Sequence, residues 1–114
     1  MKCWQITPQP SRNTMLVRYW GLNPTDALAA SLEELERAMP KVRTKLVVDL
    51  REVIGHNPSA RHLWQDFLLA HKDRLEAVYL ITPRAATMHR MVASVLGLAV
   101  GLRLRLVESP DEIP

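Results

Sequence analysis

Apolar residues follow two different spacings along the chain, and the change between them divides it into strands and helices. Short runs of branched or apolar residues predict the strands Cys3–Thr7, Thr14–Trp20, Lys45–Arg51, Ala77–Ile81 and Leu102–Val107. The continuous run Leu46-Val47-Val48 is typical of a strand that is buried on both faces of a parallel sheet. Leu102–Val107 instead places arginine between its leucines, so we expect this strand at an edge of the sheet.

Helical spacing fills the segments between the later strands. The expected inner faces are Leu28, Leu32, Leu35 and Met39 for the first helix, Leu63, Trp64, Phe67 and Ala70 for the second, and Met88, Met91, Val92, Val95 and Ala99 for the third. A polar residue followed by proline precedes each pattern, at Asn23-Pro24, Asn57-Pro58 and Thr82-Pro83. We expect the polar residue to cap the helix and the proline to take its first position, where its missing N–H costs nothing.

The predicted order is β-β-α-β-α-β-α-β, which indicates one α/β domain over residues 1–114. The prolyl connection between the first two strands predicts an antiparallel hairpin. Strands separated by a helix should be parallel, so the sheet should be mostly parallel with helices packed on it. Function on such sheets gathers beyond the carboxyl ends of the strands. The segments of interest are therefore 49–59 and 82–84.

The composition indicates the compartment in which the protein would be found. The lone cysteine, Cys3, has no partner for an internal disulfide and suits a reducing compartment. The amino-terminal segment lacks the pattern of a secretory signal. The longest apolar stretch, 91–102, is well short of the ~20 residues of a membrane span. We therefore expect a soluble, cytoplasmic protein with no membrane span.

Charged and metal-binding residue types are present without the arrangements that nucleic-acid binding, metal binding or catalysis need. The net charge is +3, but the one close basic cluster, Lys41, Arg43 and Lys45, has no interleaved aromatic residues. The four histidines have no metal-site spacing. Asp49 and Arg51 share one face of a strand, where a salt bridge is a simpler role than acid–base chemistry. We expect no enzyme activity, no cofactor, no metal and no nucleic-acid partner.

The strand Leu46–Val53 and the following loop to Asn57-Pro58-Ser59-Ala60 resemble a known family, the STAS domains of anti-sigma-factor antagonists, including sporulation-type members. The resemblance extends over the whole element order. It includes the tail Ser109-Pro110-Asp111-Glu112, which is similar to the family's entry to a terminal helix. It implies a non-enzymatic regulatory domain that binds a protein, such as an anti-sigma factor or a related kinase.

The family loop carries an Asp-Ser-Ser/Thr-Gly motif whose second hydroxyl residue is phosphorylated by the partner. On that alignment Asn57 takes the place of the aspartate, Pro58 that of the first hydroxyl residue and Ala60 that of the glycine. Ser59 falls at the phosphorylated position. Two departures, the lost carboxylate and the lost glycine, leave open whether this chain is switched.

Ser59 also has a physical case of its own. Near the start of a helix, free amides and the dipole favour an anion, and a phosphate there lies close to Arg61. The simpler alternative is that Ser59 only satisfies helix-start amides. We expect a partner-binding surface made by Asn57, Pro58, Ser59, Arg61, Thr82 and Arg84. A domain that senses or carries a small anionic or apolar ligand is the second hypothesis, and the predicted edge strand leaves a homodimer open.

Overall fold

The computed structural model describes residues 2–54, 57–83, 101 and 104–114. Its regular elements are β1 (Trp4–Gln9), β2 (Thr14–Gly21), α1 (Thr25–Ala38), β3 (Thr44–Val53), α2 (Ala60–His71), β4 (Leu75–Ile81) and β5 (Leu104–Val107). Three short 3-10 turns, η1 (Pro10–Arg12), η2 (Lys72–Arg74) and η3 (Pro110–Glu112), complete the described chain.

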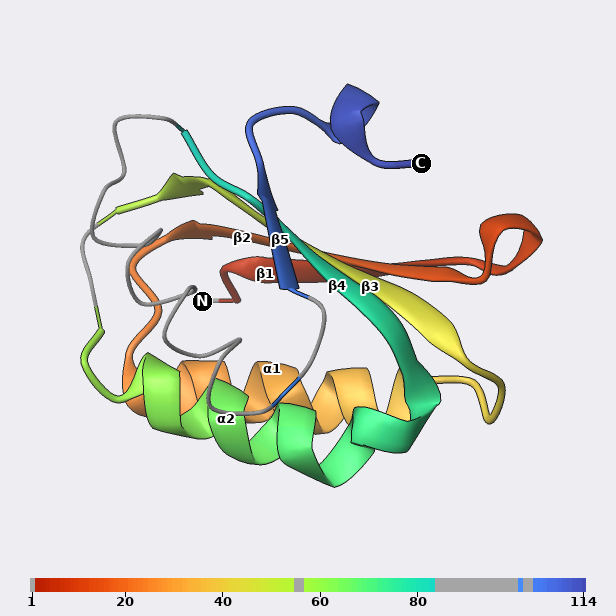
Figure 1. The fold of residues 1–114 in the computed structure, drawn as a ribbon. Coiled ribbons are helices and arrows are strands. Elements are labelled where there is room, and N and C mark those ends of the chain that lie inside the picture. The colour runs from red at the N-terminus through yellow and green to blue at the C-terminus, as the bar shows by residue number, and fades with distance from the viewer. Residues whose placement is uncertain (1, 55–56, 84–100, 102–103) are drawn as a thin grey trace.

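The strands form one sheet in the order β1-β2-β3-β4-β5. β1 and β2 pair antiparallel, and every later neighbour pairs parallel. The two described helices, α1 and α2, lie on one face of this sheet, while η3 lies on the other side (Figure 1). The hairpin, the mostly parallel sheet and the edge position of the last strand are therefore confirmed. The third predicted helix lies outside the described residues.

The sequence pattern of β3 explains how the sheet carries two apolar faces. Leu46 and Val48 join the core that packs against the helices. Val47, between them, joins a second cluster on the opposite face with Tyr79 of β4. Because successive side chains of a strand point to opposite faces, a continuous apolar run serves both clusters.

Helix α1 buries the face that its spacing predicts. Leu28, Leu32 and Leu35 are buried, and Met39 continues the stripe just beyond the helix. Helix α2 departs from its predicted face, because Ala70 is exposed while His71 is 7 % exposed. The His71 ring packs against Phe67 in a tilted arrangement, with ring centroids 4.6 Å apart. The aromatic ring of the histidine fills the place that the pattern assigned to alanine.

The predicted Asn-Pro helix starts are wrong in detail. Pro24 is extended, with φ −64° and ψ 166°, and α1 begins one residue later. The Asn23 side chain does not cap α1: its Oδ1 accepts no hydrogen bond from the described residues, and its Nδ2 donates to the Trp20 carbonyl at 3.2 Å. Ser59 holds the cap position of α2, which places Asn57 and Pro58 outside the helix. Both Asn-Pro pairs therefore shape loops rather than first turns.

The terminal turn follows its sequence pattern. Ser109 Oγ accepts from the Asp111 amide at 3.2 Å, and Glu112 Oε2 accepts from the Ser109 amide at 3.0 Å. These reciprocal bonds form a capping box at η3. The turn brings Ile113 against the Val47–Tyr79 side of the sheet.

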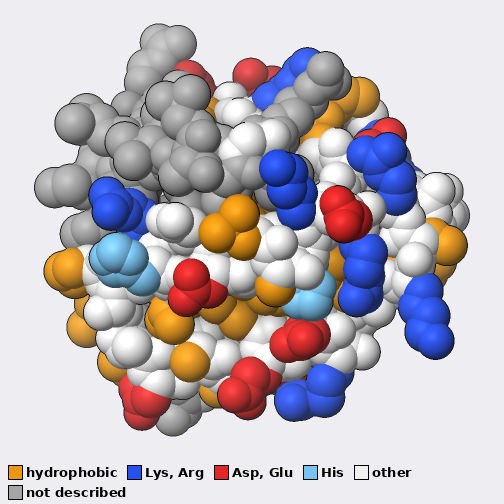
Figure 2. Space-filling model, turned by 60° about the horizontal axis from the view of Figure 1, so that its bottom comes forward, with side chains coloured by type: hydrophobic (Ala, Val, Ile, Leu, Met, Phe, Trp, Pro, Cys, Tyr) orange, Lys and Arg blue, Asp and Glu red, His pale blue; other side chains and the backbone are white. Residues whose placement is uncertain are grey.

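The outer surface of the helical layer is mixed in charge. Figure 2 shows acidic and basic side chains interspersed over this face, with histidine side chains among them. Within the described part of the chain, no helix has the length and apolar character needed to cross a membrane.

Candidate functional site

The loop between β2 and α1 meets the loop between β3 and α2 beyond the carboxyl ends of the two strands. The Ile54 amide donates to the Gly21 carbonyl at 2.9 Å, which ties the end of β3 to the end of β2. Asn57 Nδ2 donates to the Asn23 carbonyl at 3.1 Å, which ties the loop before α2 to the loop before α1. Gly21 has φ +65°, a conformation that other residues adopt at a cost. These bonds hold the loops as one surface.

Asn57 has a second role at the start of α2. Its Oδ1 accepts from the Ser59 amide at 3.0 Å, so the side chain closes a local turn while its Nδ2 reaches the neighbouring loop. The asparagine thus acts as a clamp between two loops. An aspartate at this position would keep the acceptor and lose the donor.

Ser59 and Arg61 lie at the start of α2, as the sequence predicts. Ser59 is partly buried and its hydroxyl makes no capping bond. Arg61 is exposed in the first turn of the helix. A serine hydroxyl without a structural bond at a helix start is chemically suited to carry an anionic group, because the helix dipole is positive there.

The structure separates Thr82 from this surface. Thr82 is 0 % exposed, and its amide donates to the Val107 carbonyl at 2.9 Å. It continues the pairing of β4 with β5 rather than presenting a side chain to a partner, so its assignment to the surface is wrong. Arg84 lies outside the described residues.

Two exposed apolar side chains flank the Asn57 clamp, and sequence reasoning missed them. Leu22 is 67 % exposed and Ile54 is 66 % exposed. Each directly follows the end of a strand, and the bond between Ile54 and Gly21 brings the two together. Their signal in the sequence is an apolar residue just beyond a strand end, where solvated polar residues are more usual.

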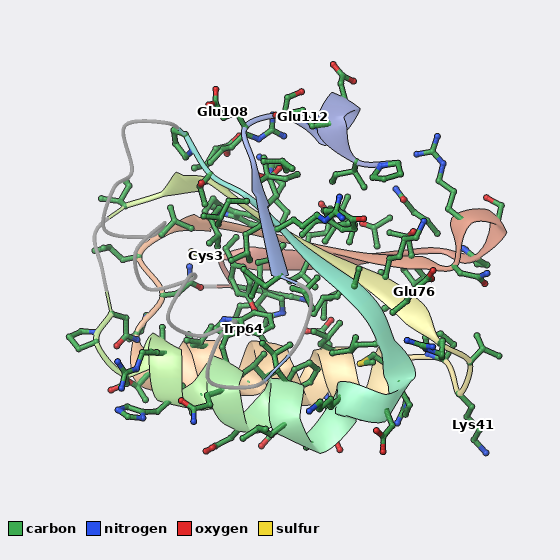
Figure 3. All side chains as sticks on the ribbon, viewed as in Figure 1. Cys3, Lys41, Trp64, Glu76, Glu108 and Glu112 are labelled. Atoms are coloured by element: carbon green, nitrogen blue, oxygen red, sulfur yellow. The ribbon has the colours of Figure 1, made fainter. Side chains whose placement is uncertain are left out.

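A cavity of about 650 Å³ lies beneath these loops. Its walls come from the sheet, at Val48, Leu50 and Leu80, and from α2, at Ala60, Trp64 and Leu68. Figure 3 shows Trp64 pointing from α2 toward the sheet. Several of these side chains, Leu50, Ala60 and Trp64 among them, are only partly buried although they pack on the core. Because most of the described lining residues are apolar, the cavity is predominantly apolar.

The rim of the cavity is where the loops and α2 meet. Leu22, Ile54, Asn57 and Pro58 line it. Arg61 also lines it and is the only charged residue among the described lining residues. The described part of the chain shows no ion-pair partner for Arg61, and no group of three His, Cys, Asp or Glu side chains that could hold a metal.

Asp49 and Arg51 take the structural role that their spacing predicts. Arg51 Nη2 lies 2.7 Å from Asp49 Oδ2, and its Nε donates to Oδ1 at 3.0 Å. Burial alone raises the pKa of Asp49, but the side-chain and backbone hydrogen bonds of Arg51 outweigh it, and the net pKa lies below the ordinary value. A paired carboxylate of this kind remains ionised at neutral pH.

Comparison with known proteins rests on the fold. No protein-family model matches the chain, and no curated protein sequence matches it. The crystal structure of an uncharacterized DUF3478-family protein with a SpoIIAA-like fold, from Shewanella loihica PV-4, superposes with a TM-score of 0.73. The match covers 98% of this chain and 91% of that one, at 14% sequence identity. The chain therefore has the SpoIIAA-like fold of STAS domains.

Proposed function

We propose that this chain is a non-enzymatic regulatory domain that binds a protein partner through the loop surface beyond β2 and β3. The observation that carries the proposal is the exposed pair of Leu22 and Ile54, held together by the Ile54–Gly21 bond. Protein contacts draw most of their energy from a few apolar or aromatic anchors that become fully desolvated. A partner side chain placed between Leu22 and Ile54 would gain such a contact.

The position of this pair beside α2 supports a switch at Ser59. Asn57 lines the same rim as Leu22 and Ile54, and it holds the amide of Ser59. A phosphate on Ser59 would add about −1.5 to −2 charges close to the two apolar side chains. Desolvating that charge opposes an apolar contact, so the modified form should release an apolar partner. The SpoIIAA-like fold is consistent with this role.

Matched substitutions test the partner surface. Leu22→Asp and Ile54→Asp should each weaken a specific partner about thirtyfold or more, because each places a charge in the contact. Val42→Asp is the control, since Val42 is 58 % exposed but lies in the loop before β3, at the other end of that strand. Lys41 extends from the same loop in Figure 3.

The readout is the affinity of one defined protein, purified after affinity capture from the source cells and titrated by calorimetry. Retention by the unmodified chain and by Val42→Asp, with loss in the other two variants, supports the surface. Equal weakening in all three variants, or no loss in any, contradicts it.

The switch has a separate measurement. Intact mass from source cells should show one phosphate that disappears in Ser59→Ala. Ser59→Asp should weaken the partner about tenfold, while Ser59→Ala should leave the affinity unchanged. If the phosphate never appears while the partner still binds, the surface stands and the switch is wrong.

A further inference from the structure

We propose that the cavity beneath the loop surface binds an amphipathic anion, with an aliphatic chain inside and a carboxylate at Arg61. The inference goes beyond partner binding, because it assigns a ligand to the space between the sheet and α2. It rests on three features of the described residues: the volume, the character of the walls and the charge at the rim.

The volume and the walls specify the body of the ligand. About 650 Å³ is within the range of sites that hold small organic molecules. Apolar side chains from β3, β4 and α2 dominate the walls. Leu50, Ala60 and Trp64 remain only partly buried against the core, so an aliphatic chain would complete their burial. Each methylene that leaves water for these apolar walls adds to the affinity, so a longer aliphatic chain should bind more tightly.

The residues at the rim indicate the chemistry of the ligand's polar end, which we call its head. The polar residues Asn23, Thr25 and Asn57 at the mouth are neutral, and Arg61 supplies the one charge among the described lining residues. Asn57 is already engaged through both ends of its amide, which leaves it little capacity for a ligand. The guanidinium of Arg61 matches a carboxylate in shape and charge. Its place in the first turn of α2 adds the positive end of the helix dipole.

The polar groups deeper in the structure do not compete for this role. Tyr19 lines the cavity, but its hydroxyl is bonded to Ser31 Oγ at 2.7 Å. Nearer the mouth, Asn23 Nδ2 is already bonded to the Trp20 carbonyl, and its buried Oδ1 is an acceptor, which does not bind an anion. An anionic head therefore has its partner at the rim, and the interior receives only the apolar part.

The test uses decanoate as the probe and Trp64 as the reporter. In the full chain carrying Trp4→Phe and Trp20→Phe, Trp64 is the remaining tryptophan and lies in the cavity wall. Decanoate, added below its micelle concentration, should change the Trp64 emission saturably. Native mass spectrometry of the unaltered chain should show one decanoate per protein.

Three variants separate the contributions of head and chain. Arg61→Gln should weaken decanoate about fivefold and leave neutral 1-decanol unchanged, because only the charged head loses its partner. Arg43→Gln, an exposed arginine in the loop before β3, should change neither probe. Ala60→Phe should abolish binding of both probes by filling the cavity. Val53→Phe, on another wall, serves if Ala60→Phe does not fold.

The proposal is overturned by any of three results: no saturable signal with decanoate, equal decanoate affinity in Arg61→Gln, or binding that survives both cavity-filling variants. These measurements use the isolated protein, so a failure here leaves the partner test intact. Conversely, loss of the protein partner in Leu22→Asp says nothing about a ligand deep in the cavity.

Discussion

At the scale of single residues, the buried pair of Tyr19 and Ser31 links the sheet to α1. Ser31 Oγ donates to the Leu28 carbonyl at 2.6 Å, so its own proton is used and it accepts from the Tyr19 hydroxyl. Tyr19 is 2 % exposed and Ser31 is 0 % exposed. Removing Ser31 would leave the Tyr19 hydroxyl buried without this partner, whereas Ser31 would keep its bond to the Leu28 carbonyl if Tyr19 were removed.

Ser31→Ala should therefore lower the free energy of unfolding by about 1–3 kcal/mol. Adding Tyr19→Phe to this variant should recover part of the loss, because the double variant leaves no orphaned hydroxyl. Urea unfolding followed by circular dichroism measures both. A double variant whose loss equals the sum of the two single losses would contradict the coupling.

The same tyrosine gives stability a dependence on alkaline pH. Burial raises the pKa of Tyr19 well above its ordinary value of 10.0, and the charge of Glu34 adds to the shift. The folded state then keeps a proton that the unfolded state releases. Stability should be complete below about pH 10 and decline as the pH rises further. In Tyr19→Phe, this part of the decline should be absent from the unfolding free energies.

At the scale of elements, the start of α2 depends on the Asn57 clamp. Asn57→Ala loses both the bond to the Asn23 carbonyl and the acceptor for the Ser59 amide. We expect it to cost about 1–2 kcal/mol of unfolding free energy. Asn57→Asp keeps the acceptor and should cost less than the alanine variant. Chemical denaturation of the two variants side by side measures this, and equal losses would show that the link to the Asn23 loop alone matters.

The element order also shows how far sequence patterns reach. The hairpin, the parallel strands and the inner face of α1 follow from spacing, because each pattern is repeated along its element. The inner face of α2 was misplaced by one residue at its end. The spacing pattern assigned Ala70 to the inner face because alanine is apolar. In the structure His71 takes this place, because its ring packs against Phe67. The helix starts were misplaced because Pro24 is extended and outside α1, and because Ser59 rather than Asn57 holds the cap position of α2.

At the scale of the whole molecule, the sheet separates two apolar clusters that share its central strand. Val48 belongs to the cluster on the helical side and Val47 to the cluster on the other side. Each is nearly inaccessible to solvent, at 1 % and 4 % exposed. A strand shared between both clusters should couple them into one unfolding unit.

Val48→Ala and Val47→Ala should each cost about 1.5–3 kcal/mol, from the lost burial and the small void left behind. Both variants should unfold in one transition, with the same midpoint by tryptophan fluorescence and by far-ultraviolet circular dichroism. Midpoints that separate in Val47→Ala alone would show that the second cluster unfolds independently.

The candidate site was predicted only in part. Ser59 and Arg61 lie at the start of α2, as the strand–loop–helix pattern indicates, because position along an element is local information. Leu22 and Ile54 are 32 residues apart, and nothing local shows that a backbone bond joins their loops. Thr82 looked equivalent to the other cap residues, yet it is fully buried and its amide pairs with the last strand.

The sequence by itself determined the order of the described elements, the direction of the strands and the edge position of β5, since these depend on the spacing of apolar residues and the length of connections. Only the tertiary structure decided which loops meet, which polar side chains form the hydrogen bonds between them, and where a cavity lies between the sheet and α2. Such features depend on contacts between residues far apart in the chain. Packing sets those contacts in three dimensions, and no single stretch of sequence contains them.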